Sequence, residues 1–144
     1  MISFRHVGIV VENMKKSLEF YQNLLGFTIK KDTNEDTCFI EKILGKHFQS
    51  LHTVKLSFPV GDGLLELLEF IPVSNDKYLG GKVSTRGISH FALTVCDVDQ
   101  FYNQLLTKKV HFISSPKKSP DGKAKVAFCL DPDGNPIELV EEIN

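Results

Sequence analysis

The feature that most constrains the fold of this chain is an internal repeat. With an offset of 84 residues, the first half aligns with the second at a histidine, at a polar residue suited to capping a helix and at several apolar positions. The aligned pairs are His6 with His90, Val11 with Val95, Asn13 with Asp97, Met14 with Val98, Leu18 with Tyr102 and Tyr21 with Leu105. An offset of 72 residues then aligns Glu66 with Glu138, each between two large apolar residues. Such self-similarity predicts two copies of one structural unit.

Hydrophobic periodicity predicts the elements of the first copy. Residues 3–11 are typical of a strand, and Asn13 is suited to cap a helix whose apolar side chains recur every three or four residues. A strand is predicted from about residue 27, and two more follow at about 52–60 and 64–71. The polar segment FIEKILGKHF that precedes them is compatible with a helix.

The second copy repeats this order. ISHFALTV predicts a strand, Asp97 is suited to cap the following helix, and VHFIS, at 110–114, predicts the next strand. A loop rich in proline and lysine precedes a last hairpin, formed by KVAFCLD and PIELVEE around the turn DPDGN. We therefore expect an α+β protein of two βαβββ modules, at about 1–72 and 87–144, joined by a linker at about 73–86.

Composition excludes several classes of function. The 144 residues are 42% hydrophobic and 24% charged, as in a soluble globular protein, and a net charge of −1 gives no electrostatic reason to expect nucleic acid or a membrane as partner. The apolar runs are too short to span a bilayer, and MISFRHVGIVV has no charged leader or cleavage site. Three cysteines, Cys38, Cys96 and Cys129, lack metal-binding spacing. We expect a reduced, cytoplasmic protein.

The repeated histidines and glutamates are the candidate site. A buried carboxylate is costly without a cation, a hydrogen-bond donor or a metal beside it. If the two modules form one curved mixed sheet, all four side chains can converge on its concave face. Two imidazoles and two carboxylates suit a divalent ion of zinc, nickel, cobalt, manganese or iron, with positions left open for substrate. The metal ligands we predict are His6, Glu66, His90 and Glu138.

Other residues compete for these roles. Glu69 and Glu141 each lie three residues beyond a predicted ligand, on the opposite strand face, and either could replace it. The remaining histidines have no counterpart in the repeat, so we expect them to be surface or structural residues; they are His47, His52 and His111.

Four segments carry a resemblance to a known family. HVGIVVENMKKSLEFYQNLLGF, LLELLEF, SHFALTVCDV and AFCLDPDGNPIELVE resemble the vicinal oxygen chelate superfamily, which has the glyoxalase/bleomycin resistance/dioxygenase fold. The resemblance implies paired βαβββ modules, one metal at a shared cleft, a small-molecule substrate and a homodimer. It also implies chemistry in which a substrate chelates the metal through two oxygens, the metal stabilises an enediolate, and Glu138 or Glu66 serves as base.

The resemblance leaves the activity open. A glyoxalase-like lyase or isomerase is favoured, because a glutamate at position 66 fits four protein ligands. Glyoxalase I proper has an arginine and an asparagine for glutathione where this chain has Val10 and Phe70. The alternatives are an isomerase like methylmalonyl-CoA epimerase, an oxidoreductase like the extradiol dioxygenases, and a non-catalytic resistance-type binding protein.

Overall fold

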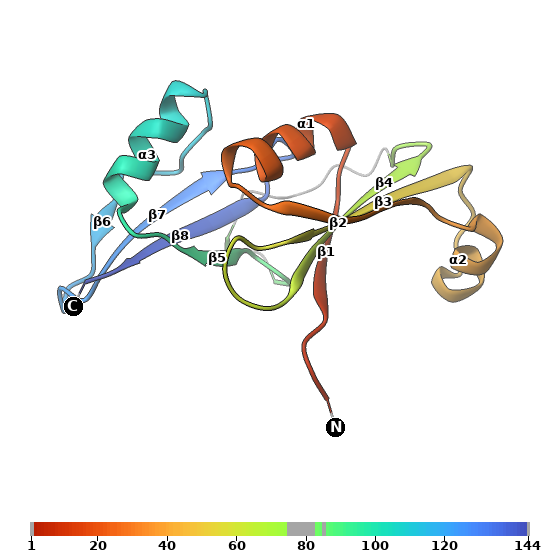
Figure 1. Cartoon of the computed structure of the whole chain (residues 1–144), viewed down its shortest axis with the longest axis horizontal. Coiled ribbons are helices and arrows are strands. Elements are labelled where there is room, and N and C mark those ends of the chain that lie inside the picture. Colours follow the sequence, from red (N-terminus) through yellow and green to blue (C-terminus); the bar gives the residue numbers. More distant parts are fainter. Residues whose placement is uncertain (1, 75–82, 85, 144) are drawn as a thin grey trace. The chain divides into compact units, whose positions relative to one another are not determined.

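The computed structural model describes residues 2–74, 83–84 and 86–143 of the chain. The chain divides into two compact units, Met1–Lys77 and Tyr78–Asn144. Each is built on one four-stranded mixed sheet, in which one strand pair is parallel and the others antiparallel (Figure 1). The predicted α+β class is therefore confirmed. The predicted linker at 73–86 falls largely on residues 75–82 and 85, which lie outside the described residues.

The first unit has a sheet of order β1-β4-β3-β2, with β1 parallel to β4. Its elements, in chain order, are β1 (His6–Val10), α1 (Met14–Leu18), the π-helical turn η1 (Glu19–Leu24), β2 (Thr28–Asn34), α2 (Thr37–Leu44), β3 (Ser50–Ser57) and β4 (Leu64–Ile71). The segment expected to be compatible with a helix thus contributes α2.

Helix α1 begins where the sequence predicts. The Asn13 side chain accepts a hydrogen bond from the backbone N–H of Lys16 at 3.0 Å, which satisfies one of the donors left free at a helix N-terminus. The helix then widens into η1, where the N–H of Leu25 bonds to the carbonyl of Phe20, five residues back, at 3.1 Å. Gly26 ends it with φ of 77°, a left-handed conformation that glycine adopts without strain.

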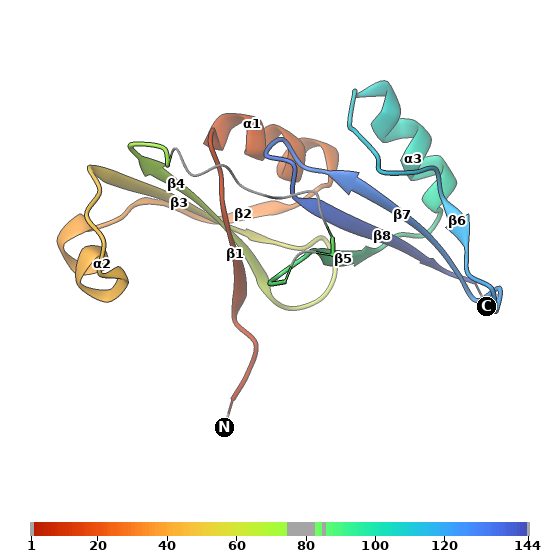
Figure 2. The ribbon, with the colours of Figure 1, turned by 180° about the vertical axis from the view of Figure 1, so that it is seen from behind.

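Alternation along β3 and β4 separates an apolar face from a polar one. Val54, Leu56, Leu65 and Leu67 are fully buried and share one face of the sheet. Glu69, on that same face, bonds to the first residue of α1, so this is the face that α1 covers; Figure 2 shows α1 lying along the sheet. Because successive side chains point to opposite faces, the residues between the buried ones lie on the other side of the sheet. This alternation places Glu66 on the face away from α1.

The second unit repeats the arrangement, with a sheet of order β5-β8-β7-β6 and β5 parallel to β8. Its elements are β5 (Phe91–Thr94), α3 (Val98–Thr107), β6 (Lys117–Lys118), β7 (Ala124–Leu130) and β8 (Pro136–Glu142). The side chain of Asp97 caps α3 by accepting from the N–H of Gln100 at 2.8 Å. Val98, Ile137 and Leu139 are fully buried in the core of this unit.

The strand predicted at 110–114 is wrong. That segment makes one isolated bridge, between Phe112 and Cys129, and the edge strand is the two-residue β6 in the segment that we expected to be a loop. His111 and Ile113 each exchange one backbone hydrogen bond with β7, and the chain then bends at 113–115 just before Pro116, which has no N–H to donate. A short apolar run in the sequence does not by itself show that the backbone hydrogen bonds to the neighbouring strand will be interrupted.

In the described part of the chain, no helix has the length and apolar character needed to cross a membrane.

Candidate functional site

His6 and Glu66 form a pair on the polar face of the first sheet. Glu66 in β4 is registered with Gly8 of the parallel strand β1, so His6 lies two residues earlier on the same face. The distance from His6 Nε2 to Glu66 Oε2 is 3.1 Å, and the two side chains are 30% and 13% exposed. The parallel pairing of the first and fourth strands of the unit therefore brings together two residues 60 positions apart in sequence.

Lys55 is a member of this cluster that the sequence analysis missed. It lies in β3 directly opposite Glu66, and its Nζ is 3.3 Å from Glu66 Oε1. The two oxygens of Glu66 therefore face different partners, an imidazole and an ammonium. Lys55 could have been identified from the sequence only if the pairing register of the strands predicted at 52–60 and 64–71 were known. The six-residue connection at 58–63 does not fix that register.

His90 and Glu138 form the equivalent pair in the second unit. Glu138 in β8 is registered with Ala92 of β5, so His90 again lies two residues earlier. His90 Nε2 is 3.3 Å from Glu138 Oε2. The hydroxyl of Ser89 is 2.7 Å from the other ring nitrogen, Nδ1, and Phe128, opposite Glu138 in β7, packs edge-on against the imidazole with ring centroids 5.1 Å apart.

The competing glutamates have a different task. Glu69 accepts a hydrogen bond from the N–H of Met14 at 2.8 Å, and Glu141 accepts one from the N–H of Val98 at 2.9 Å. Both carboxylates therefore bind the first residue of a helix, on the face opposite to the His–Glu pairs. Carboxylates are favourable there because the helix N-terminus carries free N–H groups and a partial positive charge.

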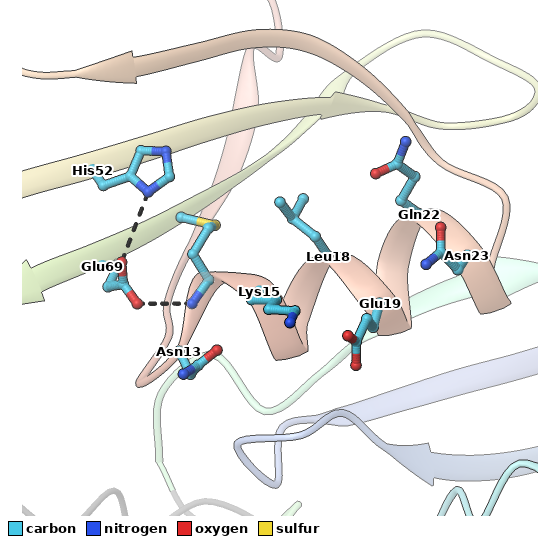
Figure 3. Close-up of a pocket in the computed structure, with 9 residues that line it drawn as sticks. Asn13, Lys15, Leu18, Glu19, Gln22, Asn23, His52 and Glu69 are labelled. Carbon is cyan, nitrogen blue, oxygen red and sulfur yellow. Dashed lines mark hydrogen bonds and ion pairs between the residues drawn. The ribbon is translucent and has the colours of Figure 1, made fainter.

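Two of the remaining histidines also have local partners. His47 is 96% exposed and bonds to Glu41 at 3.0 Å. The pKa of Glu41 is lowered mainly by the hydrogen bond that the backbone N–H of Phe48 donates to its carboxylate, and secondly by the hydrogen bond with His47. His52 Nε2 lies 2.6 Å from Asp32. His52 and Glu69 also line an open groove of about 590 Å³ along α1 (Figure 3).

The two donor atoms of each pair are spaced as two ligands of one divalent ion would be. Two ligands held at roughly 2.0–2.2 Å from one ion lie about 2.8–3.6 Å apart at angles of about 90–110°. The N–O distances of 3.1 and 3.3 Å fall in this interval, although a direct hydrogen bond accounts for them equally well. Among the residues that the structure describes, neither unit gathers three or more His, Cys, Asp or Glu side chains able to hold an ion. Each unit thus brings one histidine and one glutamate together on the polar face of its sheet.

The hydrogen bonding of the two imidazoles differs. Where His90 Nδ1 donates to Ser89, the Nε2 lone pair faces the Glu138 carboxylate, and a cation held between these two acceptors makes that contact favourable. Where Ser89 donates instead, Nε2–H bonds directly to Glu138. His6 has no such neighbour: within the described ranges, its buried Nδ1 has no hydrogen-bond partner.

The three cysteines stay outside the site. Cys38 and Cys96 are exposed, whereas Cys129 is buried in β7, and burial raises the pKa of its thiol to about 12. Cys129 is therefore protonated at physiological pH and is a poor nucleophile.

Comparisons with known proteins agree with the fold. The sequence model of the Glyoxalase/Bleomycin resistance protein/Dioxygenase superfamily matches residues 3–139. Glyoxalase I of Saccharomyces cerevisiae is 29% identical over 142 residues, which cover 95% of this chain and 42% of the yeast protein. The chain thus spans less than half the length of that relative. A lactoylglutathione lyase of Pseudomonas putida is 29% identical, covering 96% of this chain and 84% of the relative.

A solved structure supports the same assignment of the fold. The glyoxalase family protein APC24694 from Bacillus cereus superposes with a TM-score of 0.86 at 18% identity, covering 100% of this chain and 96% of the other. At this identity the similarity establishes the fold and leaves the activity open.

Proposed function

Because the chain belongs to the Glyoxalase/Bleomycin resistance protein/Dioxygenase superfamily, we propose that it is a divalent-metal-dependent lyase or isomerase. Its substrate is a small molecule with a carbonyl and a neighbouring hydroxyl group. The observation that carries the proposal is the repetition of one His–Glu pair, with the same two-residue stagger, in both units. A single pair is a common structural contact, whereas two matching pairs provide the four ligands of one site.

We propose that His6, Glu66, His90 and Glu138 hold one ion, of zinc, nickel, cobalt, manganese or iron. The two histidines contribute neutral nitrogen donors and the two glutamates balance the charge of a divalent ion. When bound, the ion supplies Lewis-acid stabilisation of negative charge that develops on a substrate oxygen. The protein's own residues orient the substrate and move its proton.

Glu138 is the better placed of the two candidate bases. Both oxygens of Glu66 have partners, His6 and Lys55. Glu138 contacts His90 through Oε2, and among the described residues none forms a hydrogen bond or ion pair with its Oε1. That oxygen is thus available to accept a proton from a carbon next to a carbonyl group. Glu66 serves mainly to bind.

The second candidate is a non-catalytic small-molecule-binding protein, since the superfamily description includes a resistance protein. Such a protein needs a shaped surface but no base. The two functions differ in whether Glu138 is required for proton exchange, and one experiment distinguishes them.

The experiment follows exchange of substrate hydrogen with D₂O by proton NMR. Zinc- and nickel-loaded protein is incubated with hydroxyacetone, and in parallel with the methylglyoxal hemithioacetals of glutathione and of a simple thiol. We expect metal-dependent loss of the signal from the carbon next to the carbonyl, reduced at least about a hundredfold in Glu138→Gln. The Glu142→Gln variant, altered at the exposed end of β8, is the control. Ligand binding without exchange by any form would favour the binding protein.

We also propose that the protein works as a cytoplasmic homodimer on a small-molecule substrate, without nucleic acid or membrane as partner.

A further inference from the structure

The two units differ at the position opposite each paired glutamate. Lys55 in β3 faces Glu66, and Phe128 in β7 faces Glu138, in the same antiparallel register. Lys55 Nζ lies 3.3 Å from Glu66 Oε1, whereas the ring of Phe128 contacts His90. The first unit therefore has a positive charge beside its pair where the second has an aromatic ring.

The surroundings of Lys55 strengthen the effect of that charge. Its side chain is 23% exposed and that of Glu66 is 13% exposed, so water screens the interaction less than at an open surface. Within the described part of the chain, Lys55 forms an ion pair with Glu66 alone. An ammonium has three N–H donors. Two of them therefore remain for another oxygen acceptor on this face of the sheet.

Because of the position of Lys55, the two oxygens of the Glu66 carboxylate have different partners. Oε1 is directed to the ammonium and Oε2 to His6 Nε2, at 3.1 Å. An ion bound beside His6 would meet Oε2 alone, from a carboxylate whose charge is already shared with an ammonium. The positive charge of Lys55 would also repel that ion. Both effects lower the affinity for metal.

We propose that Lys55 is a positioning residue for Glu66 that weakens metal binding and makes the site select an anionic substrate. This inference rests on the proposed metal site. A divalent ion with two glutamates is electrically neutral, so Lys55 leaves one positive charge in excess. The matching ligand has a carboxylate next to its carbonyl or hydroxyl oxygen, as in 2-oxo and 2-hydroxy acids.

The test uses matched substitutions in the two units. Lys55→Met removes the charge and Lys55→Arg keeps it; Phe128→Lys adds a charge beside Glu138, and Phe128→Met is its neutral control. For each folded variant, the Zn²⁺ dissociation constant is measured by competition with a chromophoric chelator. Binding of oxalate, an anion, and of acetohydroxamic acid, which is neutral near pH 7, is then followed by the visible spectrum of the Co²⁺-loaded protein.

We expect Lys55→Met to bind Zn²⁺ about tenfold more tightly and Phe128→Lys about tenfold more weakly, since groups that bond to metal ligands change affinity on this scale. Lys55→Arg and Phe128→Met should remain within about threefold of the parent protein. The preference for oxalate over acetohydroxamic acid should fall about tenfold in Lys55→Met and not in Lys55→Arg.

Unchanged or weaker Zn²⁺ binding by Lys55→Met would overturn the inference, as would an unchanged preference for oxalate. If Lys55→Met does not fold, Phe128→Lys decides: an unchanged affinity overturns the inference. If Lys55→Met alone takes up metal, the inference stands while the proposed function of the native chain fails. If no form takes up metal, both fail.

Discussion

Ser89 shows how a single side chain can determine the role of its neighbour. Its hydroxyl lies 2.7 Å from His90 Nδ1 and can hold the imidazole in the tautomer whose Nε2 lone pair faces Glu138. The repeat aligned His90 with His6 and identified it as a candidate ligand. A serine next to a histidine in sequence does not by itself predict a hydrogen bond between the Ser89 hydroxyl and His90 Nδ1.

Replacing Ser89 with alanine should weaken Zn²⁺ binding about tenfold, because the imidazole loses the hydroxyl that orients its ring and can accept the Nδ1–H bond. The measurement is the dissociation constant from chelator competition. His47→Ala is the control, since that side chain is 96% exposed and bonds only to Glu41 among the described residues. Equal affinity in Ser89→Ala and in the parent protein would mean that Ser89 does not support a metal-binding nitrogen.

The cysteines give a prediction on pH and reactivity. The pKa of Cys129 is raised to about 12 by burial, so its thiol remains protonated across pH 7–9. With a disulfide reagent such as DTNB, we expect Cys38 and Cys96 to react in the native protein and Cys129 to react only in denaturant. Its thiol should stay unreactive as the pH rises to 9. Rapid modification of all three thiols in native buffer would contradict the buried position of β7.

At the scale of elements, β4 and β8 each contain one pair of glutamates spaced three residues apart, Glu66 with Glu69 and Glu138 with Glu141. Glu66 and Glu138 belong to the His–Glu pairs, whereas Glu69 and Glu141 point to the other face and bond to the first N–H of α1 and α3. The odd spacing explains the division, because residues three apart in a strand lie on opposite faces. One strand thus shapes the site and also fixes the start of a helix.

The Glu141→Ala variant should lower the free energy of unfolding by about 1–2 kcal/mol, since the N–H of Val98 loses its carboxylate partner at the helix N-terminus. Glu69→Ala should have a similar effect in the first unit through Met14. Urea denaturation measures both, and Glu142→Ala, at an exposed position, should change stability by less than about 0.5 kcal/mol. If Glu141→Ala and Glu69→Ala are as stable as Glu142→Ala, the hydrogen bonds from the helix N-termini to Glu141 and Glu69 contribute little to stability.

Sequence reasoning worked best where one local pattern decides the structure. Asn13 and Asp97 cap helices as predicted, because the capping bond itself joins residues only three positions apart. It failed at 110–114, where the length of a ladder depends on a distant strand. It also missed Lys55, whose position opposite Glu66 depends on a hairpin register that the loop does not determine.

At the scale of the whole molecule, the proposed homodimer is a prediction from the family. Sedimentation equilibrium at micromolar concentration should give twice the mass of the 16.2 kDa chain. A single mass of 16.2 kDa across the micromolar range would contradict the dimer. In a monomer, the proposed ion could be bound only by His6, Glu66, His90 and Glu138 of the same chain.

The most direct test of the account is the metal content of the protein. Each chain contains both proposed ligand pairs, His6–Glu66 and His90–Glu138, and the proposed ion uses one of each, so the expected ratio is one ion per chain whether the pairs come from one chain or from two. After equilibrium dialysis against Zn²⁺, elemental analysis should give about one ion per chain for the parent protein and close to none for His6→Ala/Glu138→Ala. Equal metal content in both, whether near zero or near one, would contradict the account.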